Sequence, residues 1–173
     1  MFSLNVPVPP AVRSLADDLA PRLSGLVPRE EHTLLLKRLG ALDDHHVAEA
    51  RVREALAGAP AAEVRVSEVS AFQNPPSGPA PVVYLAVEGS GLYDLHERLC
   101  TAVDPVPGLE GEGYVPHVTL ARGDDGSLGG PTPRETARRL DGESVGPVTW
   151  TVEELHFYDA RHGERSGTVS LPA

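Results

Sequence analysis

The sequence has little of several residue types that mark particular classes of protein. It holds a single cysteine, Cys100, in 173 residues, which excludes an internal disulfide and a zinc site built from several cysteines. No apolar run approaches the roughly 18 residues of a membrane span. The first residues, Met1 to Val6, lack the basic stretch and long apolar region of a signal peptide. A cytoplasmic protein is therefore expected.

Lysine is almost absent as well. Lys37 is the only lysine among 15 basic residues, which face 25 acidic ones and leave a formal net charge of −10. Arginine in place of lysine with excess acid is typical of a GC-rich, halophilic proteome, although GC bias alone is the alternative. The charge argues against a nonspecific nucleic-acid coat, which needs a broad basic face. It does not exclude a small pocket for one phosphate.

Hydrophobic periodicity predicts short strands interspersed with helices. Strands are expected at residues 2–8, 33–39, 63–72, 81–87, 117–122, 147–158 and 167–171, and helices at 11–26, 45–56, 91–103 and 134–140. Pro21 is expected to kink the first helix or stop it early, and Asp43 or Asp44 can cap the second. The Pro- and Gly-rich segments 73–79, 104–114 and 123–133 are expected to be loops, the last of them mobile. Helices between strand pairs indicate an α+β fold with a mainly antiparallel sheet.

The most informative segment is the strand around His117. Alternation places His117 and Thr119 on one face of this strand and Val118 and Leu120 on the other. An imidazole beside a hydroxyl on one face offers a proton-transfer group next to a hydrogen-bond donor. A second such strand lying opposite would complete a symmetric site for a phosphate.

A second histidine–threonine pair, His32-Thr33, lies about half a chain upstream, at the start of the apolar segment 33–39. Each pair is followed by an arginine and a glycine, namely Arg38 and Gly40 in the first segment and Arg122 and Gly123 in the second. One such pair is weak evidence, because short strands commonly carry a surface His and Thr. Two pairs with similar flanks suggest a duplicated half-domain.

The segment Pro116-His117-Val118-Thr119-Leu120-Ala121-Arg122 resembles the second signature of the 2H phosphoesterase superfamily. Nearly the whole chain is similar to the 2′–5′ RNA ligase-like branch, also called RNA 2′,3′-cyclic phosphodiesterases. Counterparts there include the opening strand with its Pro-led helix, Lys37-Arg38-Leu39-Gly40, and the closing segment 150–158. The resemblance implies one bilobed domain over residues 1–173, in which two mainly antiparallel sheets face a central cleft and helices lie outside.

The first half of the site departs from the family pattern of His, apolar, Thr. Here Thr33 directly follows His32, so the two side chains would point to opposite faces of a regular strand. Aligned without a gap from Gly40, Thr33 falls where the His should be and Leu35 falls where the Thr should be. A β-bulge at His32-Thr33 could turn both side chains toward the cleft, and this is the favoured account. The alternative is a degenerate first half-site that binds without turnover.

The resemblance implies metal-independent hydrolysis of RNA 2′,3′-cyclic phosphate ends to 2′-phosphates, with 2′–5′ ligation as the reverse reaction. Histidine suits both the base and the acid, because its ordinary pKa of about 6.5 leaves both forms accessible near neutrality. By resemblance, His117 is assigned as the base and His32 as the acid, in an interchangeable order, and Thr33, Thr119 and Arg122 as substrate-binding residues. No metal or other cofactor is implied, and nothing demands more than a monomer.

Two side chains, Arg122 and Tyr114, each allow two interpretations. On a regular strand Arg122 lies opposite His117, so it either curls toward the phosphate or pairs with Glu112 or Asp124. Tyr114 either stacks on a base or, as favoured, packs under the strand.

The remaining histidines give little evidence of a functional site. Asp43-Asp44-His45-His46 is better explained as a capped helix start than as a metal site, because consecutive helical residues diverge. His96 is expected at the surface, and Cys100 is expected to pack in its helix.

Overall fold

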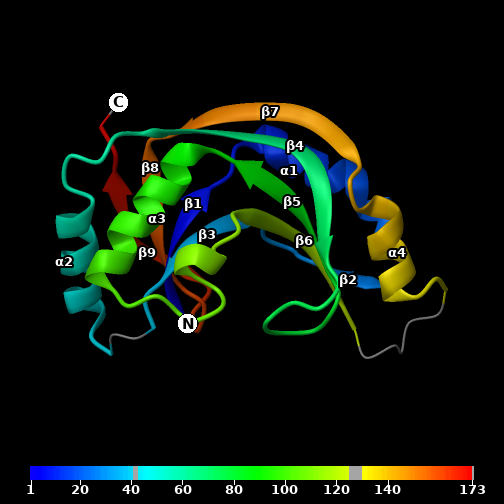
Figure 1. Ribbon diagram of the computed structural model, residues 1–173, viewed down its shortest axis with the longest axis horizontal. Helices are drawn as coiled ribbons and strands as arrows, with labels where there is room; N and C mark the ends of the chain where they lie inside the picture. Colours follow the sequence, from blue (N-terminus) through cyan, green and yellow to red (C-terminus); the bar gives the residue numbers. More distant parts are fainter. Residues whose placement is uncertain (41–42, 125–129, 173) are drawn as a thin grey trace.

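The computed structural model describes residues 1–40, 43–124 and 130–172 as one nine-stranded, mainly antiparallel sheet flanked by helices (Figure 1). The strands are β1 (Phe2–Pro7), β2 (Leu26–Pro28), β3 (Thr33–Arg38), β4 (Ala62–Phe72), β5 (Val82–Glu88), β6 (His117–Gly123), β7 (Ser144–Val152), β8 (Glu154–Asp159) and β9 (Glu164–Ser170). The helices are α1 (Pro10–Leu19), α2 (His45–Ala55), α3 (Ser90–Ala102) and α4 (Pro133–Leu140), with short 3₁₀ turns at Ala20–Arg22 (η1) and Gly111–Gly113 (η2).

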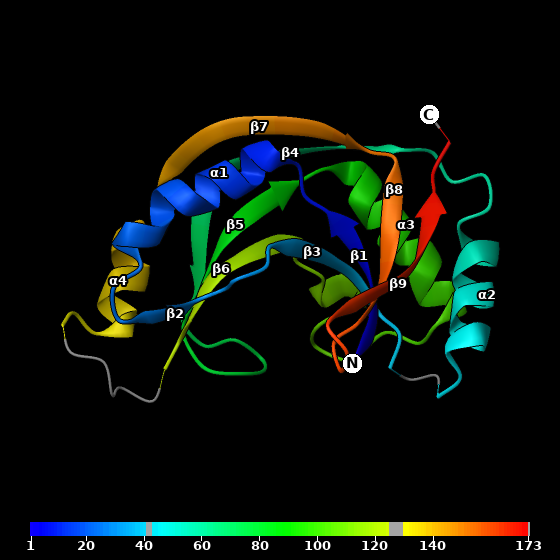
Figure 2. The ribbon, with the colours of Figure 1, turned by 180° about the vertical axis from the view of Figure 1, so that it is seen from behind.

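The sheet consists of two halves that meet at one narrow junction. The strand order is β7-β4-β5-β6-β3-β1-β8-β9, with β2 paired to β6. Strands β3 and β6 are joined by a single residue pair, Leu34 opposite Val118. The sheet curves strongly around this junction, with α2 and α3 at one end and α1 and α4 at the other (Figures 1 and 2). The expected two sheets are therefore the two halves of one continuous sheet.

Local sequence signals explain most helix boundaries. Helix α1 begins at Pro10 and ends at Leu19, and the chain continues as the η1 turn around Pro21, so the early stop is confirmed. Helix α2 is capped by Asp44, whose carboxylate accepts from the His46 N–H at 2.8 Å. Helix α4 begins at a capping box in which Thr132 and Glu135 accept from each other's backbone N–H.

The sequence did not predict every element. Strand β2 was not expected, and the single strand expected at 147–158 is two strands, β7 and β8. None of the helices within the described ranges is long and apolar enough to cross a membrane. Of the expected mobile loop at 123–133, residues 125–129 lie outside the described part of the chain.

Candidate functional site

A pocket lies at the junction of the two halves of the sheet. Strand β3 contributes Leu35 and Arg38 to its wall, and β6 contributes His117 and Arg122. The rest comes from Phe72 and Val82, from the loop between β4 and β5, and from the segment that leads into β6. The pocket thus combines one imidazole and two guanidinium groups with a mostly apolar lining.

The single pair between β3 and β6 determines which side chains face this pocket. Leu34 and Val118 lie opposite each other and both are fully buried in the core. Because strand residues alternate in direction, Thr33 and Leu35 share the other face with His117 and Thr119. An approximate two-fold through this pair relates Thr33 to His117 and Leu35 to Thr119. The alignment that runs back from Gly40 without a gap, with Thr33 at the His position and Leu35 at the Thr position, therefore agrees with the geometry of β3.

Both strands contain a β-bulge, and the two bulges lie at equivalent positions. In β3 the register against β1 shifts by one residue, so that Leu36 and Lys37 together lie opposite Leu4. In β6 the same shift sets Leu120 and Ala121 together against Val83. The favoured bulge at His32-Thr33 is therefore misplaced, since the irregularity recorded in β3 lies three residues farther on.

The bulges bring two arginines to the pocket. A bulge places two successive residues against one partner and thereby reverses the alternation beyond it. Arg122 consequently returns to the face of His117, and Arg38 returns to the face of Leu35. Arg122 thus lines the pocket, and its contact with a phosphate stays a prediction. Arg38 was not assigned a role from the sequence, although its offset from Thr33 equals the offset of Arg122 from His117.

His117 is held as a neutral imidazole with a defined proton. Its Nδ1 lies 2.6 Å from the Val115 carbonyl oxygen, which can only accept, so Nδ1 carries the hydrogen and Nε2 is left as the acceptor. Burial lowers the pKa of His117 below its ordinary value, and the charges of Arg122 and Arg38 lower it further, against the Val115 bond. The rings of Tyr84 and Phe72 contact its sides at centroid distances of 5.3 and 5.7 Å. A neutral imidazole of this kind suits a general base.

Arg122 is anchored by the loop between β4 and β5. Its Nη1 donates to the Ser77 carbonyl at 3.1 Å. Gly78 has a φ of +79°, and a Cβ there would lie 2.8 Å from that same Nη1. Glycine at this position therefore gives the guanidinium its space.

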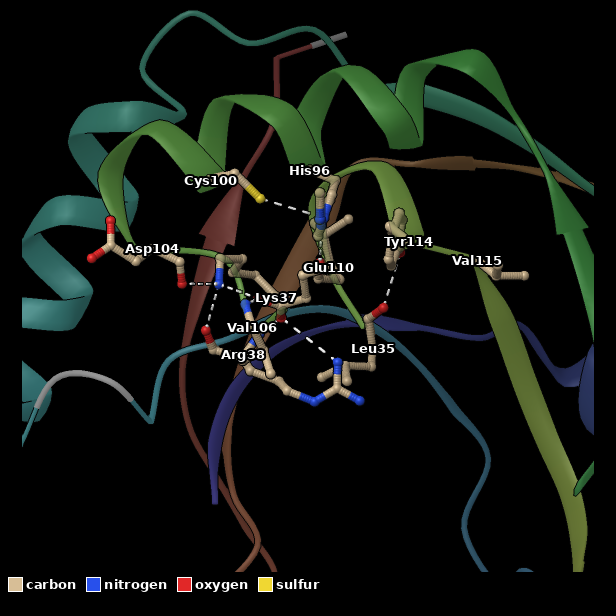
Figure 3. Close-up of polar contacts among 12 residues, drawn as sticks. Leu35, Lys37, Arg38, His96, Cys100, Asp104, Val106, Glu110, Tyr114 and Val115 are labelled. Carbon is tan, nitrogen blue, oxygen red and sulfur yellow. Dashed lines mark hydrogen bonds and ion pairs between the residues drawn. The ribbon is translucent and has the colours of Figure 1, made fainter. Parts of the chain in front are cut away.

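Arg38 lies beside a buried ion pair that fixes β3 to the segment before β6 (Figure 3). The Lys37 ammonium and the Glu110 carboxylate are 2.6 Å apart, with side chains 0% and 1% exposed. Glu110 also accepts from the backbone N–H groups of Arg38 and Val106, at 2.7 and 2.9 Å. These bonds lower the pKa of Glu110 against the opposing effect of its burial. Arg38 Nη1 is 3.7 Å from the same carboxylate.

His96 and Tyr114 complete this support (Figure 3). His96 is buried at 3% exposure rather than lying at the surface. Its Nε2 accepts from the Gly111 N–H at 2.9 Å, so its Nδ1 donates to the Leu36 carbonyl at 2.8 Å. Tyr114 stacks on the His96 ring at 3.9 Å and donates to the Leu35 carbonyl. The prediction that Tyr114 packs under the strand is confirmed.

His32 is not among the described residues that line the pocket with His117. Burial lowers the pKa of His32, and Asp17 and Arg13 of α1 have smaller, opposing effects on it. The position of His32 follows from alternation, because it precedes Thr33 and so starts on the opposite face. Thr33 and Thr119, two of the expected substrate-binding residues, are likewise not part of the pocket lining. Thr33 shares the face of Leu35, but its hydroxyl donates to the Val6 carbonyl at 3.1 Å.

The charged and metal-ligating residues outside the pocket add no second centre. Among the residues that the structure describes, no group of three or more His, Cys, Asp or Glu side chains is placed to hold a metal ion. His45, from the segment considered as a metal site, stacks on Phe2 at 3.9 Å instead.

Comparison with known proteins assigns the fold and the family. A family model described as the 2′-5′ RNA ligase superfamily matches residues 12–164. No curated protein matches the sequence significantly. A crystal structure from Thermus thermophilus shares 20% identity with a TM-score of 0.71, over 98% of this chain and 97% of that one. Escherichia coli LigT complexed with 3′-AMP shares 17% identity with a TM-score of 0.64, over 99% and 98%. These structures confirm the α+β fold.

Proposed function

Because this chain belongs to the 2′-5′ RNA ligase superfamily, we propose that its pocket binds the phosphate at the end of an RNA or nucleotide. We further propose that the protein opens a 2′,3′-cyclic phosphate slowly, with His117 as the one imidazole that the described residues contribute to the pocket. Membership of this superfamily supports a phosphoesterase-type reaction, hydrolysis or ligation. The cyclic RNA end is the substrate that we infer for this chain.

The pairing of Leu34 with Val118 carries this proposal. It supports the proposal because His117 lines the pocket and Thr119 shares its strand face, while Thr33 and Leu35 stand at the related positions of the other half. The β6 half can therefore supply an imidazole and a hydroxyl. The β3 half has no imidazole at Thr33 and no hydroxyl at Leu35.

The chemistry of a single imidazole follows from its protonation state. Neutral His117 accepts a proton at Nε2 from a water that attacks phosphorus, while the bond from phosphorus to the ribose 3′ oxygen breaks. The leaving 3′ oxygen then takes its proton from solvent, because no second imidazole donates one. The loss of a positioned general acid costs about 10²–10⁴-fold in rate. The Thr119 hydroxyl and the two arginines stabilise the developing charge on the phosphoryl oxygens.

A second candidate function is phosphate binding without turnover. Leu35 favours it, because an apolar side chain stands where a donor to the phosphoryl oxygen would act, and Thr33 already donates to Val6. The two candidates share the pocket and differ only in whether the ring opens.

One experiment separates them. An oligonucleotide with a 2′,3′-cyclic phosphate is incubated in EDTA, at low and high salt, with the wild type, His117→Ala, and His46→Ala as a control for loss of an exposed histidine. Slow turnover that disappears only in His117→Ala supports hydrolysis. Saturable binding without turnover, weakened by His117→Ala, supports the binding function. A wild type that neither binds nor hydrolyses this end overturns both.

A further inference from the structure

Both halves of the pocket carry an arginine, although only the β6 half carries a histidine in the lining. Arg38 and Arg122 lie at equivalent positions beyond equivalent bulges, and both line the same pocket. Because the positions are related by the approximate two-fold, the guanidinium groups approach the pocket from its two sides. The pocket therefore has a positive charge from each half, Arg38 and Arg122, but an acid–base group, His117, from only one half.

The charge of Arg38 is not cancelled by its neighbour Glu110. That carboxylate lies 2.6 Å from Lys37 and 3.7 Å from Arg38, so one negative charge serves two cations. The closer cation is fully buried, whereas the Arg38 side chain is 24% exposed. Arg38 thus presents positive charge to the pocket in a chain whose net charge is −10.

Arg122 adds a second positive charge that repels the first. Burial lowers the pKa of Arg122, and the charges of Arg29 and Arg38 lower it further. One N–H of its guanidinium is engaged by the Ser77 carbonyl, which fixes its orientation. Fixed cations that repel one another are stabilised by an anion that binds between them, and a doubly charged anion relieves more of the repulsion than a singly charged one.

We propose that the pocket prefers a phosphate monoester end, a dianion, over the cyclic phosphodiester, a monoanion, because Arg38 and Arg122 act as a charge-matched pair. This inference rests on the proposed function, since it concerns the same pocket. It assigns the opened RNA or nucleotide end as the preferred ligand. Arg38 is the residue that confers the preference, and its counterpart Arg122 supports it.

The preference is measured as a ratio of affinities at pH 8, where a phosphate monoester is dianionic because its second pKa is about 6. One oligonucleotide sequence is prepared with a 2′-phosphate, a 2′,3′-cyclic phosphate, the methyl ester of a 3′-phosphate, or a free hydroxyl end. The methyl ester is a linear monoanion, so it separates the effect of charge from that of the ring. The expected order is monoester first, by about tenfold or more over either monoanion.

The variants assign the effect to the pair. Arg38→Gln is expected to weaken monoester binding about tenfold and monoanion binding less, which reduces the ratio. Arg98→Gln, which removes an exposed arginine on α3, is expected to leave the ratio unchanged. Circular dichroism and thermal unfolding check that each variant folds, and Arg38→Lys tests whether charge alone restores part of the ratio.

The outcomes distinguish this inference from the proposed function. Equal binding of monoester and cyclic ends, or a ratio that survives in folded Arg38→Gln, overturns the inference and leaves the proposed function standing. Absence of binding to every phosphorylated end overturns both. A monoester preference that Arg38→Gln removes and Arg98→Gln does not is the supporting result.

Discussion

Strands β3 and β6 carry the two halves of one site, and they differ in chemistry while agreeing in geometry. Both contribute a fully buried residue to the junction, both contain a bulge at the same position, and both place an arginine in the pocket. Strand β6 carries an imidazole and a hydroxyl at His117 and Thr119, whereas β3 has Thr33 and Leu35 at the related positions. The two strands therefore share a backbone geometry while their side chains differ.

The two halves also differ in how they are supported. Strand β3 is tied by Lys37, Glu110 and the stacked pair His96 and Tyr114 to the segment before β6. His117 depends on that same segment, because its Nδ1 bonds to Val115 within it. The contacts that support β3, which has no imidazole, thus also help to position His117 on β6.

Restoring the missing half is expected to have the largest effect. Thr33→His with Leu35→Thr places an imidazole and a hydroxyl opposite Thr119 and His117, so the leaving oxygen gains a general acid. Hydrolysis of a 2′,3′-cyclic phosphate is expected to rise about 10²–10⁴-fold over the wild type. The measurement is single-turnover hydrolysis in EDTA.

The same double substitution in a His117→Ala background is the control, because the new imidazole should then lack its partner. A folded double variant that binds the substrate but gains no activity would contradict the two-fold relation between the half-sites.

Removal of the buried charge that supports β3 is expected to have the next largest effect. Glu110→Gln leaves Lys37 as an uncompensated buried cation, which costs about 3–5 kcal/mol of the free energy of unfolding. Chemical denaturation of the wild type and variant measures this loss. Lys37→Met with Glu110→Gln removes the unpaired charge and should recover part of it. A loss below about 1 kcal/mol in the single variant would show that the pair is not buried as described.

A smaller and more local difference separates His117 from His32 on titration. Burial lowers the pKa of both, but only His117 lies beside Arg122 and Arg38. A phosphate monoester bound between those arginines is expected to raise the pKa of His117 and leave that of His32 unchanged. Imidazole NMR shifts recorded from pH 4 to 8 measure both. Equal movement of the two would place both histidines at the phosphate.

The direction in which stability changes with pH follows from the lowered pKa values of His117 and His32. Both folded-state pKa values lie below the unfolded value of about 6.5, so the unfolded chain binds more protons in the interval between them. The stabilisation from neutral His117 and His32 is present above about pH 6.5 and is lost as the pH falls toward their folded-state values. Thermal unfolding from pH 7.5 to 5 should therefore show a falling midpoint, and His117→Gln should reduce the slope.

The sequence predicted most of the elements and the shared face of His117 and Thr119, because those signals are local. Alternation alone places His117 with Thr119, and the segment around His117 is recognisable without any partner strand. The bulges were not predictable in place, because a bulge is defined by the register against a neighbouring strand. That register decided the faces of Arg38 and Arg122 together.

His96 shows a signal that was available and was not used. It lies four residues after Leu92 and three before Leu99, the spacing of the buried stripe of α3. Its polarity favoured the surface, but Gly111 and Leu36 satisfy both ring nitrogens from distant segments. Such partners come from the tertiary fold, so the sequence alone could not supply them.

The smallest effect is expected from the residue that the sequence made a catalytic candidate. His32→Ala removes a half-buried imidazole beside α1, so we expect turnover or binding of a cyclic phosphate end within about twofold of the wild type. The loss of stability should be below about 1 kcal/mol, because the change touches no buried network. Thr33→Ala is the matched substitution on the pocket face. A large loss of activity in His32→Ala, with the fold intact, would return His32 to the pocket and restore the two-histidine mechanism.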